Sequence, residues 1–68
     1  MDAAVSLTEQ ECKVYQEVLL GKCNKEIARE LHISVRTVRF HMANILAKHG
    51  LGNRVELLAN FASLRRHA

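Results

Sequence analysis

The sequence predicts an all-α fold, a four-helix bundle that forms one domain. Its 68 residues are 49% hydrophobic and include no proline, a composition that favours a compact helical chain over a disordered one. Apolar residues recur at steps of three and four, which is the spacing of one helix face. Helix-capping residues and three glycines divide this pattern into helices over roughly 9–20, 25–31, 35–49 and 54–64.

Two local signals bound the first helix. Thr8 and Glu11 have the T-x-x-E spacing of a capping box, in which each side chain accepts a hydrogen bond from the other residue's backbone N–H. Gly21 stands where a residue in the left-handed conformation ends a helix. Cys12 falls within this helix, and we expect it to be buried. The inward face is expected to comprise Val14, Tyr15, Val18 and Leu19.

The second and third helices follow each other closely. Asn24 is the predicted N-cap of the second helix, and Ser34 is the predicted N-cap of the third, which ends at Gly50. His32 and Ile33 form the connection between them. A short helix, a tight turn and a longer helix in succession predict a helix-turn-helix.

The third helix is divided into an apolar face and a basic face. One stripe at helical spacing comprises Val35, Val38, Met42, Ile45 and His49, and its aliphatic members should face the core. The opposite face comprises Arg36, Arg39, Phe40, Ala43, Asn44 and Ala47. A solvated helix face usually mixes Glu with Lys, so the lack of any carboxylate here needs a different explanation.

The basic face belongs to a wider asymmetry of charge. Residues 31–68 hold six Lys and Arg against one acid, and no acid lies between Glu30 and Glu56. A solubilising surface is one interpretation, and a nucleic acid or another anionic partner is the other. Because the major groove of DNA, about 12 Å wide, admits one α-helix, the charge and the helix-turn-helix pattern both indicate DNA.

The fourth helix is apolar on two sides, although a terminal helix in a small domain needs only one buried stripe. Val55, Leu58, Ala59 and Ala62 make one stripe. The other comprises Leu57, Phe61 and Leu64, and we predict it as the interface of a homodimer. Alternatively, both stripes are covered within the monomer.

The four predicted helices make residues 7–64 the domain. We expect a flexible N-terminus (1–6) before it and a frayed C-terminus (65–68) after it.

Several classes of protein are not expected. No apolar run approaches the roughly 20 residues that span a membrane, and the first residues lack the pattern of a signal peptide. The two cysteines, Cys12 and Cys23, are expected to be reduced thiols, and their spacing to the four histidines matches no zinc site. No catalytic set or glycine-rich phosphate loop is present. We therefore expect a non-enzymatic, cytoplasmic protein without metal, cofactor or small-molecule ligand.

The pattern resembles the LuxR-type (GerE-type) helix-turn-helix DNA-binding domain of bacterial transcription regulators. The runs NKEIA, L-x-I-S, TV-x-x-H and K-x-G carry this resemblance together. The matching residues are Leu7, Thr8, Glu11, Val14, Gly21, Asn24 to Ala28, Leu31, Ile33, Ser34, Thr37, Val38, His41, Ile45, Lys48, Gly50 and Arg54. The resemblance implies that the third helix is the recognition helix and that the fourth forms the dimer. It leaves open whether the chain is a stand-alone regulator or the excised DNA-binding domain of a response regulator.

The resemblance also implies roles for single residues. The positions of Arg39, Phe40 and Ala43 face DNA bases in relatives, although alanine at position 43 departs from the polar or basic residue found there. Arg39 can donate two hydrogen bonds to guanine, or else contact a phosphate, and Phe40 can meet a thymine methyl group, or else pack on a neighbouring helix. Phosphate contacts are expected from Lys25, Ser34, Arg36, Thr37, Lys48 and Arg54.

The expected function is sequence-specific binding of double-stranded DNA and regulation of transcription as a homodimer in the bacterial cytoplasm, on the nucleoid. RNA polymerase is a further expected partner of such a regulator. The alternative is a helix-turn-helix scaffold used as a protein–protein interaction module through the fourth helix. The long stretch without acids favours DNA over this alternative.

Overall fold

The computed structural model describes the backbone of residues 6–66 and the side chains of residues 6–64. Four α-helices follow one another in this part of the chain: α1 (Glu9–Leu19), α2 (Asn24–Leu31), α3 (Val35–His49) and α4 (Arg54–Arg66). The prediction of an all-α fold with four helices is confirmed. None of the described helices is both long enough and apolar enough to cross a bilayer.

The predictions for the two termini fall largely outside the described residues. Of the predicted flexible N-terminus (1–6), the structure describes only Ser6. Of the predicted frayed C-terminus (65–68), it describes only the backbone of residues 65 and 66, which are the last two residues of α4.

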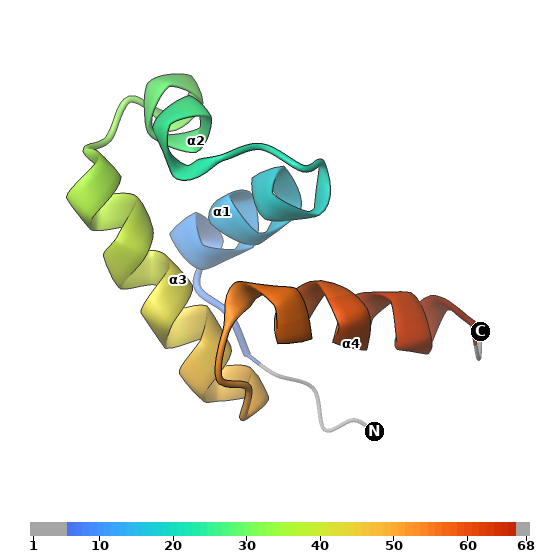
Figure 1. Ribbon diagram of the computed structural model, residues 1–68. Coiled ribbons are helices and arrows are strands. Elements are labelled where there is room, and N and C mark those ends of the chain that lie inside the picture. The colour runs from blue at the N-terminus through green and yellow to red at the C-terminus, as the bar shows by residue number, and fades with distance from the viewer. Residues whose placement is uncertain (1–5, 67–68) are drawn as a thin grey trace.

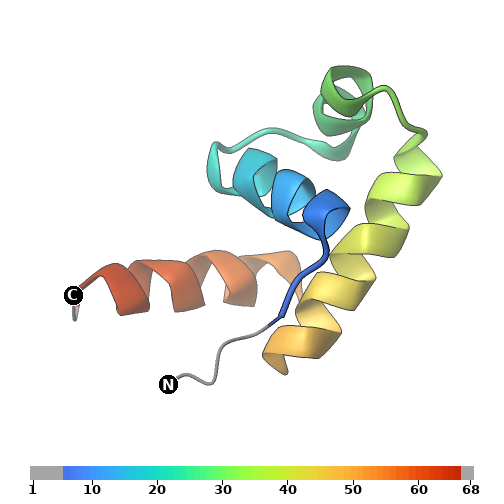
Figure 2. The same ribbon diagram turned by 180° about the vertical axis from the view of Figure 1, so that it is seen from behind.

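α3 is the longest helix and forms one side of the molecule (Figure 1). α1 packs against α3, and α2 lies beside the N-terminal half of α3. α4 leaves the C-terminal end of α3 and extends away from α2, as both views show (Figures 1 and 2). This arrangement supports α3 from one side and leaves its other side facing outward.

All four helices contribute to one apolar core. A fully buried Val, Leu or Ile side chain contributes about 1.5–3 kcal/mol relative to an exposed one, so a domain this small depends on each of them. The buried apolar residues are Val14, Val18, Ile27, Ala28, Val38, Met42, Ile45 and Leu57.

The predicted capping box of α1 is present. Thr8 N–H donates to Glu11 Oε1 at 3.0 Å, and Glu11 N–H donates to Thr8 Oγ1 at 3.2 Å. Gly21 follows the helix with φ +84°, in the left-handed region that glycine adopts without strain. The prediction that Cys12 is buried is wrong, because Cys12 is exposed. It lies one turn from the exposed Gln16 and therefore faces away from Val14.

The helix-turn-helix begins one residue earlier than predicted. Cys23, not Asn24, is the N-cap of α2, and its N–H donates to Glu26 Oε1 at 3.0 Å. His32, the C-cap of α2, has φ +58°. Ser34 caps α3 as predicted, since its Oγ accepts the Thr37 N–H at 3.0 Å. Hydrogen bonds between residues close in sequence therefore cap both helices of the helix-turn-helix.

α4 follows a turn that contains Gly50 with φ +69° and Asn53, whose Oδ1 accepts the Glu56 N–H at 2.9 Å. The structure corrects the predicted dimer interface for Leu57, whose side chain is fully buried in the core of the monomer. Phe61 is half-buried, with its ring edge-on to Tyr15 at 6.4 Å between centroids. Leu57 and Phe61, the first two residues of the stripe predicted to face a partner, therefore point into the monomer.

Candidate nucleic-acid interface

The structure divides α3 as its sequence predicts. Val38, Met42 and Ile45 are buried in the core. The opposite face is exposed and comprises Arg36, Arg39, Phe40, Ala43 and Ala47. Because no carboxylate lies between residues 31 and 55, this face has no acid of its own to neutralise its two arginines.

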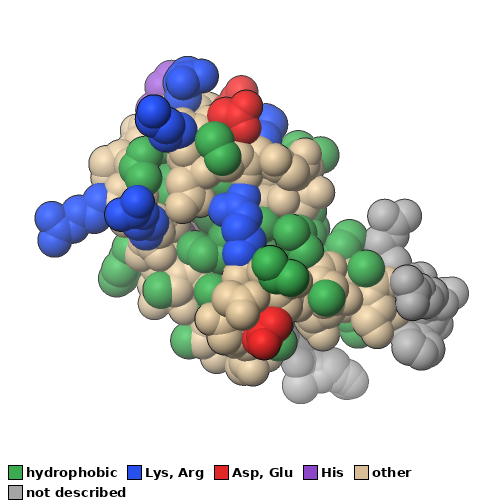
Figure 3. Space-filling view, in the orientation of Figure 1, with side chains coloured by type: hydrophobic (Ala, Val, Ile, Leu, Met, Phe, Trp, Pro, Cys, Tyr) green, Lys and Arg blue, Asp and Glu red, His purple; other side chains and the backbone are tan. Residues whose placement is uncertain are grey.

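Three cations on α2 and α3 are free of other protein groups. Lys25, Arg36 and Arg39 are exposed, and none forms an ion pair or hydrogen bond with another residue in the described part of the chain. In the space-filling view, Lys and Arg side chains gather along the margin formed by α2 and the N-terminal half of α3 (Figure 3). An anion could therefore bind these cations without first breaking an ion pair between a cation and a carboxylate of the protein.

Sequence reasoning missed a fourth cation of this margin. Arg29 is exposed and lies one helical turn after Lys25, so the two side chains project from the same side of α2. Glu26 and Arg29 do not form an ion pair, and the Glu26 carboxylate accepts the Cys23 N–H instead. This backbone hydrogen bond is the main reason that the pKa of Glu26 lies below its ordinary value. The i, i+4 spacing of the two cations was the available signal.

The N-terminus of α3 carries both predicted hydroxyl groups. Ser34 Oγ and Thr37 Oγ1 lie 2.9 Å apart and share a hydrogen bond. Ser34 is exposed and Thr37 is half-buried. Helix N-termini attract anions through the helix dipole and through backbone N–H groups that lack intrahelical partners. The two hydroxyl groups thus lie at an end of α3 that suits a phosphate.

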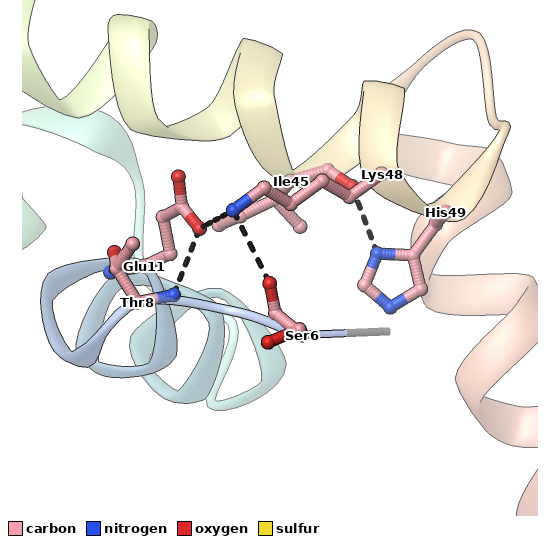
Figure 4. Close-up of polar contacts among 6 residues, drawn as sticks. All are labelled: Ser6, Thr8, Glu11, Ile45, Lys48 and His49. Carbon is pink, nitrogen blue, oxygen red and sulfur yellow. Dashed lines mark hydrogen bonds and ion pairs between the residues drawn. The ribbon is translucent and has the colours of Figure 1, made fainter. Parts of the chain in front are cut away.

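Lys48, predicted to contact a phosphate, is exposed, but its ammonium group forms two contacts within the domain. Its Nζ donates to Glu11 Oε1 at 2.6 Å and to the Ser6 carbonyl at 3.2 Å (Figure 4). The same Glu11 oxygen accepts the Thr8 N–H. Glu11 is only 4% exposed, and the Lys48 ammonium is the main reason that its pKa lies below the ordinary value. Lys48 therefore compensates a buried carboxylate and ties the end of α3 to the start of α1.

Arg54, also predicted to contact a phosphate, bridges two helices. One guanidinium nitrogen donates to Asn24 Oδ1 at 2.8 Å, and the other donates to the Lys22 carbonyl. Arg54 is the first residue of α4, and Asn24 is the first residue of α2. The side chain thus connects the start of the fourth helix with the start of the helix-turn-helix, so the structure gives Arg54 a positioning role.

Among the described residues, no group of three His, Cys, Asp or Glu side chains is placed to hold a metal ion. The site that the structure does assemble is an exposed helix face with free cations beside it. We refer to Lys25, Arg29, Arg36, Arg39 and Phe40 as the α2–α3 surface.

Comparison with known proteins identifies this arrangement. Residues 5–61 match the family model described as bacterial regulatory proteins of the luxR family. The chain is 41% identical over 51 residues to the transcriptional regulatory protein LiaR of Bacillus subtilis and 47% identical over 51 residues to the transcriptional regulatory protein UhpA of Salmonella typhimurium. It is 42% identical over 50 residues to the transcriptional regulatory protein ComA of B. subtilis.

These matches cover 75%, 75% and 74% of this chain, but only 24%, 26% and 23% of LiaR, UhpA and ComA, respectively. The chain thus spans about a quarter of the length of these relatives. The matched family consists of regulatory proteins, which agrees with the prediction that this domain is not an enzyme. The chain belongs to the LuxR family of bacterial regulatory proteins.

Proposed function

We propose that the domain recognises a specific sequence of double-stranded DNA by placing α3 in the major groove. The observation that supports this most strongly is the exposed, acid-free face of α3, whose Arg36 and Arg39 have no partner in the described part of the chain. The face is convex and carries positive charge, and the major groove admits one helix between two rows of phosphates. Membership of the LuxR family supports the same ligand.

We assign base contacts and phosphate contacts to different side chains on and beside the α2–α3 surface. Arg39, Phe40 and Ala43 lie on the outward face of α3, where we place them against base edges. The expected phosphate ligands are Lys25, Arg29, Ser34, Arg36 and Thr37. Lys48 and Arg54 are left out of this set, because their charged groups hold the helices in place.

We further propose that the domain acts as a homodimer. Two copies would place their α3 helices in successive major grooves about 34 Å apart, on a site with approximate two-fold symmetry. α4 offers the surface for this contact, since Val55 is 75% exposed and Leu58 is 38% exposed. These two residues share a face with Ala59 and Ala62, which are also exposed. A self-complementary contact between two copies of one helix is the simplest two-fold interface.

The domain would act on the nucleoid in the bacterial cytoplasm, with RNA polymerase as a further partner. The alternative function, a protein–protein interaction module, would use the exposed face of α4 and would not need the cations of α2 and α3.

The test is selection of bound duplexes from a random pool by the purified domain, followed by a gel-shift titration of the winning sequence. We expect enrichment of one motif with two related halves. Scrambling either half should weaken binding, because each mismatched base pair costs about 1–3 kcal/mol. A pool without any enriched motif would reject specific recognition, and an enriched motif without internal symmetry would reject the homodimer.

A further inference from the structure

Phe40 is the most unusual side chain on the α2–α3 surface. It is 63% exposed, whereas the other two aromatic residues, Tyr15 and Phe61, are half-buried and pack against each other. The aromatic ring beside Phe40 is that of its chain neighbour His41, at 5.8 Å between centroids. Phe40 is therefore not tucked against another helix, and the core gives no reason for an aromatic side chain at this position.

The exposed side chains around Phe40 on the outward face of α3 are cationic or apolar. Arg36 lies one helical turn before it, and Arg39 is its neighbour in the chain. One turn further on are Ala43 and then Ala47, both exposed and without side-chain hydrogen-bonding groups. Among the exposed members of the outward face, the two arginines thus carry the hydrogen-bonding groups, while the half-buried Asn44 lies one turn after Phe40. The phenyl ring and the two alanines form an apolar stretch beside the arginines.

We propose that Phe40 is a specificity-determining residue that contacts the C5-methyl group of a thymine in the major groove. This proposal rests on the proposed function and names the base that the site selects. The other bases are distinguished in that groove by their hydrogen-bond donors and acceptors, whereas thymine alone presents a methyl group. A phenyl ring placed against a donor or an acceptor would remove it from water without a replacement hydrogen bond, which disfavours those bases.

The position of Arg39 makes the expected site more specific. A guanidinium can donate two hydrogen bonds to O6 and N7 of guanine. Because Arg39 and Phe40 are adjacent on one helix, the bases that they contact must lie within a few steps of each other. The selected half-site should therefore contain a guanine and a thymine close together.

Deoxyuridine provides the test, because it differs from thymidine only by the missing methyl group. Each thymine of the selected duplex is replaced in turn by deoxyuridine, and affinities are measured for the wild-type domain and for Phe40→Ala. The wild-type domain should lose about fourfold in affinity at one thymine of a half-site, as expected for one buried methyl group. Phe40→Ala should bind the thymine and deoxyuridine duplexes equally.

Leu20→Ala is the matched control. Leu20 is 70% exposed and caps the C-terminus of α1, an end that lies away from α3 in both views (Figures 1 and 2). This variant also removes an exposed apolar side chain, but it should keep the wild-type sensitivity to deoxyuridine. Circular dichroism would verify that both variants retain their helices.

The outcomes are distinguishable. If deoxyuridine is neutral at every thymine while specific binding persists, the proposal for Phe40 is wrong and the proposed function stands. If Phe40→Ala keeps the full sensitivity of the wild type, another side chain contacts the methyl group and the proposal is equally wrong. If no duplex is enriched in the selection, the proposed function itself fails, and this proposal fails with it.

Discussion

The contact between Glu11 and Lys48 shows how single residues hold the recognition helix in place. A buried carboxylate is costly unless it is paired and hydrogen-bonded. Here, one oxygen of Glu11 accepts both the Lys48 ammonium and the Thr8 N–H. The pair joins the first turn of α1 to the last turn of α3, so we expect it to fix the angle at which α3 leaves the core.

The lowered pKa of Glu11 predicts how stability depends on pH. A carboxyl group whose pKa is lower in the folded state stabilises the fold above its unfolded pKa, and this contribution is lost as the pH falls through the folded pKa. Glu11→Gln should therefore lower the melting temperature at pH 7. The difference from the wild type should shrink as the pH falls below the ordinary pKa of 4.5. Thermal unfolding followed by circular dichroism between pH 7 and pH 3 measures this.

Glu9→Gln is the control for this prediction. The Glu9 side chain is 88% exposed, and its contact with Lys13 is long, at 3.9 Å, so its removal should change the melting temperature little. A difference between wild type and Glu11→Gln that stays constant over the whole pH range would show that the carboxylate charge does not provide the stabilisation.

At the scale of residues, the sequence predicts local contacts and misses distant ones. The bond between Thr8 and Glu11 spans three residues and follows a recognisable spacing. The bonds from Lys48 to Glu11 and from Arg54 to Asn24 span 37 and 30 residues. Nothing in helical periodicity indicates such pairs. Two cations predicted to contact phosphates therefore have structural roles that only the fold reveals.

At the scale of helices, the same distinction holds. Caps and stops predict the observed bounds of α3, because Ser34 and Gly50 act through backbone geometry within one turn. For α4, local sequence signals do not predict which side of the helix is buried. Its sequence is apolar on two sides, and choosing the buried side requires the position of α4 relative to α1 and α3. The structure buries Leu57 and exposes Val55, and for this reason we propose the stripe of Val55 as the dimer surface.

The exposed face of α4 predicts the effect of a charge at its centre. Val55→Asp should leave the monomer folded, because Val55 is 75% exposed. It should prevent self-association and lower the affinity for a two-half site at least tenfold, because a buried, unpaired charge costs several kcal/mol. Sedimentation velocity gives the oligomeric state, and the number of copies bound per duplex gives the stoichiometry.

Leu20, the C-cap of α1, is similarly exposed and again offers the control. The variant Leu20→Asp should self-associate like the wild type. If Val55→Asp forms the same dimer as the wild type, the exposed stripe of α4 is not the interface. A wild-type domain that binds DNA only as single copies would contradict the homodimer altogether.

At the scale of the whole molecule, charge is distributed unevenly between its two sides. The acids lie mainly on α1 and α2, whereas α3 carries none. Six of the seven acids accept hydrogen bonds from, or form ion pairs with, groups of this chain: Glu9, Glu11, Glu17, Glu26, Glu30 and Glu56. The free cations of the α2–α3 surface should therefore dominate the field that a polyanion meets as it approaches.

The dependence of DNA binding on salt probes the placement of α3 against DNA. The logarithm of the binding constant should fall linearly with the logarithm of salt concentration, with a slope of about −0.9 for each phosphate that the protein neutralises. The double variant Arg36→Ala, Arg39→Ala should weaken binding and make the slope shallower by about one unit for each phosphate that the variant no longer neutralises. Lys13→Ala, which removes an exposed cation of α1, should leave the slope unchanged. Equal slopes for the wild type and the double variant would show that α3 does not lie against DNA.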